Sequence, residues 1–297
     1  MTNEELLQRM EDEIALRGLS PWTRREYIQK AQVLINYFSP KLLSEVSDSE
    51  LRSFLLYQKN VLKRAPGTVN VYNSACRFIF GAIVGRYVNY QQIPRVKIVR
   101  SLPDIMSEDE IQSLFNACDD GSKDALRDKA ILMTMYGSGL RLSEVANLKC
   151  SDIFASTGTI KVRFGKGQKD RLTLLSKTHL QVLSDYWRFT KPNTPEGYLF
   201  VTKFGTQITP RAIQDIFAKR LRLAGLSHKP YTPHTLRHNF ATDMLNSGTD
   251  VCTIKKLLGH THIQSTTFYL HLLEFEEGLE SPLDRLAKKK KGGAKDA

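Results

Sequence analysis

The stretch TPHTLRHNFATDMLNSG, residues 232–248, combines a helix start, a helix stop and a basic first turn. Thr232 is a typical N-cap, Pro233 suits the first helical position, and Gly248 is a typical stop. His234 and Arg237 are three residues apart, so they project from one face of the helix. Cationic and donor groups that converge on a helix N-terminus favour an anion as their ligand.

A zinc site is the alternative for this helix, because His234 and His238 stand at positions i and i+4. The helical zinc motif requires glutamate at its second position, where this chain has Thr235. Arg237, next to His238, would also repel a dication. We therefore expect no metal and no other cofactor here.

Length and composition are those of a basic globular protein with ample core. The 297 residues suggest two domains or one large domain, and a hydrophobic content of 41% is ordinary. No apolar run could span a bilayer, and the acidic start MTNEELLQRMEDE is unlike a signal peptide, so we expect a cytoplasmic protein without a membrane partner. The scattered cysteines lack a CxxC pair and predict reduced thiols; they are Cys76, Cys118, Cys150 and Cys252.

The net charge of +12 is unevenly distributed. Nine cations and no acid lie between Glu50 and Asp104, whereas a merely solvated face mixes both signs. This segment therefore predicts contact with nucleic acid. The candidate DNA-binding residues of the N-terminal region are Arg24, Arg25, Lys63, Arg64 and Arg77.

The chain is expected to form two mainly helical domains with a small antiparallel sheet. Residues 1–88 contain four helical patterns, and residues 89–104, with two prolines in NYQQIPRVKIVRSLP, form the best linker. A second domain, 105–287, begins with a capping box at Ser107 and Glu110. Within it GTIKVRF and RLTLL alternate as strands around the turn GKGQKD. Residues 288–297, KKKKGGAKDA, predict a disordered basic tail.

Two further cations stand in unusual positions. Arg141 in GSGLRLSEVANL lies at a helix N-terminus, a poor electrostatic location for a cation unless it faces a phosphate. Lys166 lies in the turn between the two predicted strands, where it could enter a groove or simply be solvated.

Six positions together resemble, in order and spacing, the active site of the tyrosine recombinases, the phage-integrase and Xer-type site-specific recombinases. These positions are Arg141, Lys166, His234, Arg237, His260 in LLGH, and Tyr269 in STTFYLH. The resemblance covers essentially the whole chain. It implies a C-shaped clamp made of a helical core-binding domain and a catalytic domain. It also implies a tetramer on two double-stranded DNA sites, with the segment EEGLESPLDRLAKK docking on a neighbouring subunit.

The resemblance further implies phosphoryl transfer without metal or ATP. Tyr269 would attack the DNA and form a 3′-phosphotyrosine. Arg141 and Arg237 would grip the non-bridging oxygens, and His260 would donate another hydrogen bond. The family's remaining roles would fall to Lys166, as the acid for the leaving 5′ oxygen, and to His234, as the base. Glu144 would orient Arg141 or the lysine turn.

Three other functions stay open: a type IB topoisomerase, a non-catalytic DNA-binding regulator, and a metal-dependent nuclease, which the absence of a clustered ligand set disfavours. The sequence does not give the recognised site, the choice among integration, excision and dimer resolution, or a chromosomal or mobile-element origin. The need for an accessory protein or a second recombinase is equally open.

Overall fold

The computed structural model describes residues 1–89, 91–98, 103–163, 170–190, 197–260 and 266. The chain divides into two compact units, Met1–Arg100 (unit 1) and Ser101–Ala297 (unit 2). Each unit has its own hydrophobic core. Within the described residues, no helix has the length and apolar character needed to cross a bilayer.

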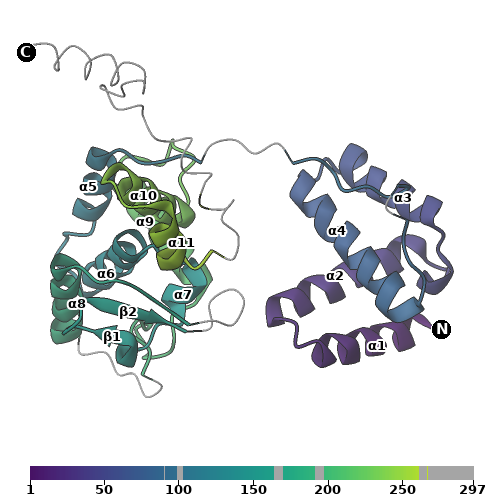
Figure 1. The fold of residues 1–297 in the computed structure, drawn as a ribbon, viewed down its shortest axis with the longest axis horizontal. Helices are drawn as coiled ribbons and strands as arrows, with labels where there is room; N and C mark the ends of the chain where they lie inside the picture. Colours follow the sequence, from purple (N-terminus) through teal and green to yellow (C-terminus); the bar gives the residue numbers. More distant parts are fainter. Residues whose placement is uncertain (90, 99–102, 164–169, 191–196, 261–265, 267–297) are drawn as a thin grey trace, which may run out of the picture. The chain divides into compact units, whose positions relative to one another are not determined.

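Unit 1 is entirely helical in its described part (Figure 1). Its elements are α1 (Asn3–Leu16), α2 (Pro21–Phe38), the 3-10 helix η1 (Leu43–Glu45), α3 (Asp48–Leu56), the π-helix η2 (Tyr57–Val61), α4 (Pro66–Phe78) and the π-helix η3 (Ile79–Val84). The Ser20 side chain accepts a hydrogen bond from the Thr23 amide, so the N-cap predicted for α2 is confirmed. The core of the unit includes Leu34, Phe54 and Phe80.

A polar stripe on α4 binds the segment that follows the last helix of unit 1. Asn70 exchanges hydrogen bonds with both the N–H and the C=O of Val96, each at 2.9 Å. One turn further along, Asn73 donates to Pro94 O at 3.1 Å, and Arg77 donates to Ile93 O at 2.6 Å. Residues 91–98 have no regular secondary structure, as the sequence predicts, but α4 holds their backbone in place.

Unit 2 contains helices around a small antiparallel sheet (Figure 1). Its elements are α5 (Glu108–Asn116), α6 (Lys123–Ser138), α7 (Leu142–Ala146), the 3-10 helix η4 (Cys150–Asp152), β1 (Ile153–Phe154), β2 (Thr159–Val162), β3 (Arg171–Leu174), α8 (Lys177–Thr190), α9 (Pro210–Leu223), α10 (Pro233–Asn246) and α11 (Val251–Leu258). The strand order is β1-β2-β3, with Ile160 opposite Thr173. The predicted hairpin and capping box are confirmed, as is the mainly helical fold.

The turn between α6 and α7 brings two parts of the chain into close contact. Gly139 adopts a left-handed conformation, with φ of 61°, and ends α6. A Cβ atom at this position would lie 2.5 Å from Phe240 on α10. Because glycine has no side chain, the turn can lie directly against α10. Arg141, the N-cap residue of α7, and Arg237 on α10 both approach the carboxylate of Glu144.

Candidate active site

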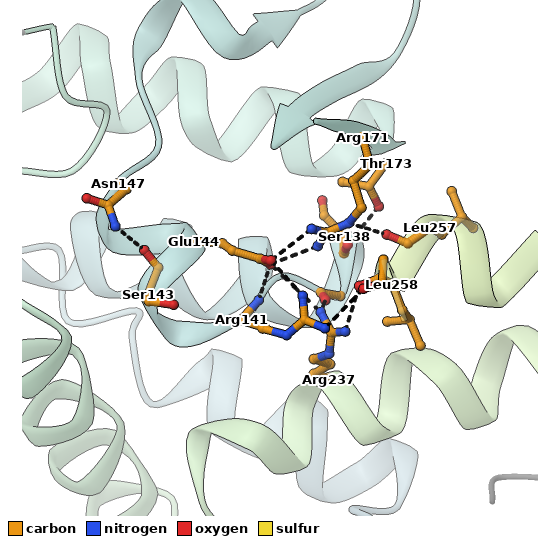
Figure 2. A network of polar contacts seen from close by, with 12 residues as sticks. Ser138, Arg141, Ser143, Glu144, Asn147, Arg171, Thr173, Arg237, Leu257 and Leu258 are labelled. Atoms are coloured by element: carbon orange, nitrogen blue, oxygen red, sulfur yellow. Dashed lines mark hydrogen bonds and ion pairs between the residues drawn. The ribbon is translucent and has the colours of Figure 1, made fainter. Parts of the chain in front are cut away.

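The centre of the site is the carboxylate of Glu144, whose side chain is only 6% exposed. It accepts hydrogen bonds from the backbone N–H and Nη1 of Arg141, at 2.7 and 2.8 Å. Arg171 on β3 donates to both carboxylate oxygens, at 2.8 and 2.7 Å, and Arg237 Nη1 lies 3.8 Å away. Figure 2 shows these side chains converging from α7, β3 and α10. Glu144 thus contacts Arg141, one of the two groups that it was expected to orient.

Charge balance in this cluster favours an anionic ligand. Burial alone would raise the pKa of Glu144, but the hydrogen bonds and charge of Arg171, with those of Arg141, lower it to about 2. The carboxylate is therefore ionised at neutral pH. Three guanidinium groups face this single negative charge, so the cluster keeps an excess of positive charge.

The same three arginines bind the C-terminal end of α11. The backbone N–H groups of Gly259 and His260 satisfy Lys256 O and Lys255 O, each at 3.1 Å. Each of the next three carbonyls accepts from one arginine: Leu257 O from Arg171 Nε at 2.7 Å, Leu258 O from Arg237 Nη2 at 2.7 Å, and Gly259 O from Arg141 Nη2 at 3.3 Å. Cations are favoured at this end of a helix, where carbonyls lack partners within the helix. These bonds fix the position at which His260 leaves α11.

His260 is held as a neutral imidazole. Burial lowers its pKa to about 3, and the charges of Arg237, Arg141 and Arg171 act in the same direction. Its Nδ1 is hydrogen-bonded to the hydroxyl of Thr266 at 2.8 Å. If the hydroxyl donates this bond, the proton of the imidazole is on Nε2, which can then donate to a phosphate oxygen.

His234 lies in the first turn of α10. Desolvation lowers its pKa, and the nearby charges of Arg237 and Arg141 lower it further. The imidazole is thus biased towards the neutral form, which can accept a proton. His238, on the same helix, has its pKa lowered to about 4, chiefly by burial. No group of three or more potential metal ligands occurs among the residues that the structure describes.

The structure therefore places five of the predicted site residues in unit 2 near the junction of α7, α10 and α11. These residues are Arg141, Glu144, His234, Arg237 and His260. Lys166 and Tyr269 lie outside the described residues, as do the C-terminal segment and the tail. The hairpin that contains Lys166 in its turn reaches the site through Arg171, the first residue of β3.

The candidate DNA-binding residues of unit 1 differ in their surroundings. Arg25, Lys63 and Arg64 are exposed. Lys63 has φ of 50°, a left-handed conformation that favours glycine. Arg24 is also exposed but pairs with Glu11, at 2.7 Å from Nη2. Arg77 donates hydrogen bonds to Val88 O and Ile93 O in its own unit, so these contacts assign it a structural role.

A cavity of about 250 Å³ in unit 1 gathers further cations of the acid-free segment. Its lining includes Arg52, Lys59, Arg95 and Lys97, together with apolar side chains of α3 and α4. These four cations belong to the acid-free segment for which contact with nucleic acid is predicted, but they are not among the five named DNA-binding candidates.

Two site residues were missed in the sequence, Arg171 and Thr266. Arg171 follows the GKGQKD turn directly, and in β3 it shares a face with the buried Thr173. An arginine on the inward face of a strand needs a buried acceptor, and that was an available signal. Thr266 offered no comparable signal, because its contact with His260 depends on the path of the chain after Gly259.

Comparisons with known proteins agree with this arrangement. The model of the phage integrase family matches residues 104–275, and that of the phage integrase N-terminal SAM-like domain matches residues 6–89. A putative integrase/recombinase y4qK from Sinorhizobium fredii is 37% identical over 271 residues, covering 90% of this chain and 84% of the relative. Tyrosine recombinase XerA from Pyrococcus horikoshii is 32% identical over 274 residues, covering 91% and 90%.

Among solved structures, the fold is similar to XerH site-specific recombinase bound to palindromic difH substrate, a post-cleavage complex. That match has a TM-score of 0.73 and 21% identity, and covers 86% of this chain and 78% of XerH. The family models span both units, and the relatives match along nearly the whole chain. The chain is therefore a member of the phage integrase family, the tyrosine recombinases.

Proposed function

We propose that the protein is a site-specific DNA recombinase that cleaves and rejoins DNA through a phosphotyrosine at Tyr269. The observation that carries this proposal is the convergence of Arg141 and Arg237 on one buried carboxylate and on the helix end that precedes His260. Such a cluster suits a phosphodiester, which gathers negative charge on its non-bridging oxygens during transfer.

The remaining roles are those that the resemblance to the tyrosine recombinases implies. The phenol oxygen of Tyr269 attacks phosphorus, and the bond to the 5′ oxygen breaks. His234 accepts the phenol proton, and Lys166 protonates the departing oxygen, leaving a 3′-phosphotyrosine and a free 5′ hydroxyl. The hydroxyl of a partner strand then attacks the phosphotyrosine. Neither ATP nor a metal is required, because the ester stores the energy of the broken bond.

The partners we propose are two double-stranded DNA sites in the cytoplasm and three further copies of the chain. XerH site-specific recombinase, whose fold is similar, was solved bound to palindromic difH substrate, which supports a DNA site as the ligand here. The segment EEGLESPLDRLAKK of one subunit would dock on its neighbour in the tetramer. A related recombinase or an accessory protein would be compatible with this assembly.

A nicked duplex tests the nucleophile. Duplexes that bind the protein would be selected from a random pool and nicked at successive positions, so that the 5′ hydroxyl fragment diffuses away after cleavage. In EDTA, the wild-type protein is expected to form a covalent adduct that resists denaturation. Tyr269→Phe should bind the duplex with unchanged affinity and form no adduct, and an undiminished adduct in this variant would reject the assignment.

Strand exchange separates recombination from the alternatives. Two duplexes of different length, each with a selected site, should yield recombinant products with the wild-type protein. Relaxation of supercoils without exchange would favour a topoisomerase, and binding without cleavage would favour a regulator. Cleavage that requires a divalent metal would favour a nuclease.

We also propose that Lys63 and Arg64, in the turn before α4, contact DNA phosphates. Lys63 occupies a left-handed position where glycine would be less strained, so the choice of lysine suggests a role outside the fold. Lys63→Gly should keep or raise the unfolding free energy while it weakens DNA binding and reduces the salt dependence of affinity by about one phosphate contact. Unchanged affinity and salt dependence would reject this contact.

A further inference from the structure

Arg171 has every side-chain nitrogen bound within the protein. Nη1 and Nη2 donate to the two oxygens of Glu144, and Nε donates to Leu257 O at the end of α11. Its side chain is 9% exposed, compared with 21% for Arg141. The arrangement suits a residue that holds other groups in place better than one that binds a phosphate directly.

The aliphatic part of Arg171 also packs against α11. Gly259 has φ of 64°, and a Cβ atom on it would lie 2.8 Å from Arg171 Cδ. The missing side chain of Gly259 therefore makes room for Arg171. One side chain thus contacts both the carboxylate that orients Arg141 and, in the segment before His260, Leu257 and Gly259.

We propose that Arg171 is a positioning residue for strand cleavage: it fixes Glu144, and through it Arg141, against the end of α11 from which His260 projects. This inference rests on the function proposed above. Because Arg171 begins β3, it also joins the hairpin that contains Lys166 to the arginine cluster. Arg171 would then connect the strand that follows Lys166 in the chain to the groups that stabilise the phosphodiester.

Removal of the Arg171 side chain would break specific contacts in the site. Loss of Arg171 leaves the carboxylate of Glu144 with the guanidinium groups of Arg141 and, at 3.8 Å, Arg237. It also leaves Leu257 O without this donor. Small displacements of catalytic groups reduce rates by about 100-fold, while binding through many phosphate contacts tolerates them. Cleavage should therefore suffer far more than DNA affinity.

The test measures single-turnover adduct formation on the nicked duplex at saturating protein, together with DNA affinity. Arg171→Met should reduce the cleavage rate by about 100-fold with affinity within about twofold of wild type. Arg171→Lys, which keeps the charge but cannot bridge both oxygens, should be reduced less. Arg163→Met is the matched control, because Arg163 on the same hairpin pairs with a different buried carboxylate, Asp152. This control should cleave at nearly the wild-type rate.

A double variant shows whether Arg171 acts through Glu144. If it does, Arg171→Met combined with Glu144→Gln should be no slower than the slower single variant. As the pH decreases, cleavage by Arg171→Met should begin to slow at a higher pH than cleavage by the wild type, because Glu144 loses the partner that keeps it ionised. The double variant, which lacks this carboxylate, should not show that shift in its pH–rate profile. Other charged groups near Glu144 are Lys149, Asp152 and Arg163, which line a cavity beside it and stay unchanged.

The outcomes separate this inference from the proposed function. If the wild-type protein forms no adduct on any selected duplex, the proposed function fails. If the wild type cleaves, and both Arg171→Met and Arg171→Lys cleave at the wild-type rate, Arg171 is not a positioning residue. An equal loss in Arg163→Met, or additive losses in the double variant, would likewise overturn the inference. If Arg171→Met loses its circular dichroism signal, it is unfolded, and the cleavage rate of Arg171→Lys then tests the inference. A wild-type cleavage rate in Arg171→Lys would overturn it.

Discussion

The hydroxyl of Thr266 determines which nitrogen of His260 can donate a hydrogen bond. Thr266 is fully buried, and its Oγ1 lies 2.8 Å from Nδ1 of the imidazole. With a pKa of about 3, His260 is neutral throughout the physiological range, so only one of its nitrogens has a proton. A hydrogen-bond partner at Nδ1 selects which nitrogen that is.

Thr266→Val removes this partner while it preserves the shape of the side chain. The variant is expected to cleave about tenfold more slowly, because one hydrogen bond no longer favours the tautomer with the proton on Nε2. Thr266→Ser, which keeps the hydroxyl, should remain close to wild type. Single-turnover adduct formation measures both rates, and equal rates for the valine and serine variants would contradict this role.

Arg237 and Arg171 differ in whether their place in the site could be predicted from the sequence. Arg237 could be predicted, because its helix start, its neighbour His234 and its spacing are all local features. Arg171 acts through contacts 27 and 86 residues away in the chain, with Glu144 and Leu257. Alternation in RLTL favours the two leucines as core residues, yet Leu172 and Leu174 are exposed and Arg171 points inward. Burial of the Arg171–Glu144 pair decides the face of β3, and the identity of the distant partner cannot be found from the strand alone.

Among the elements, the turn between α6 and α7 controls how closely Arg141 approaches Arg237. Gly139 O accepts a hydrogen bond from Arg237 Nη1, and its bare Cα faces Phe240. The absence of a side chain on Gly139 thus allows the turn to pack on α10 and brings Arg141 towards Arg237.

Gly139 in this turn and Gly137 in the last turn of α6 form a matched pair for measurement. Gly139→Ala should lower the unfolding free energy by about 2–4 kcal/mol, since it strains a left-handed residue and collides with Phe240. Gly137→Ala should be neutral or raise it by about 0.5–1 kcal/mol, because its Cβ would meet only His179 Nδ1 at 4.0 Å and alanine favours the helix. Urea unfolding followed by circular dichroism measures both. Equal effects would show that Phe240 does not limit this turn.

Element boundaries could be predicted where capping residues define them. The starts of α2, α5 and α10, the end of α6, and the pairing of β2 with β3 all follow from N-caps, glycines and strand alternation. The short strand β1 was missed, because its two residues contain no periodic pattern. Docking of residues 91–98 on α4 was missed as well. This docking depends on the side-chain amides of Asn70 and Asn73, and in the sequence these residues look like ordinary polar surface residues.

For the protein as a whole, buried neutral histidines link stability to pH. His179 is 1% exposed, bound to Thr134 on α6, and burial lowers its pKa to about 4. The unfolded chain takes up a proton near the ordinary pKa of 6.5, whereas the folded protein does so only near 4. Stability from His179 is therefore complete above pH 6.5 and falls as the pH decreases towards 4.

His179→Gln should flatten this dependence. Between pH 6 and 4.5, its unfolding free energy should fall less steeply than that of the wild type, by about 1.4 kcal/mol per pH unit. Trp187 lies on α8 with His179, so urea unfolding can be followed by its fluorescence in a Trp22→Phe background. A difference between the two proteins that stays constant with pH would contradict a neutral buried His179.

The central claim is that Tyr269 becomes esterified to DNA beside the arginine cluster. The most direct measurement is mass spectrometry of peptides from the covalent adduct, after nuclease digestion of the DNA. We predict that the peptide containing Tyr269 bears a nucleotide linked through its 3′ phosphate, in the wild-type protein and in EDTA. An ester on any other residue, a 5′ linkage, or no protein–DNA ester at all would contradict the account.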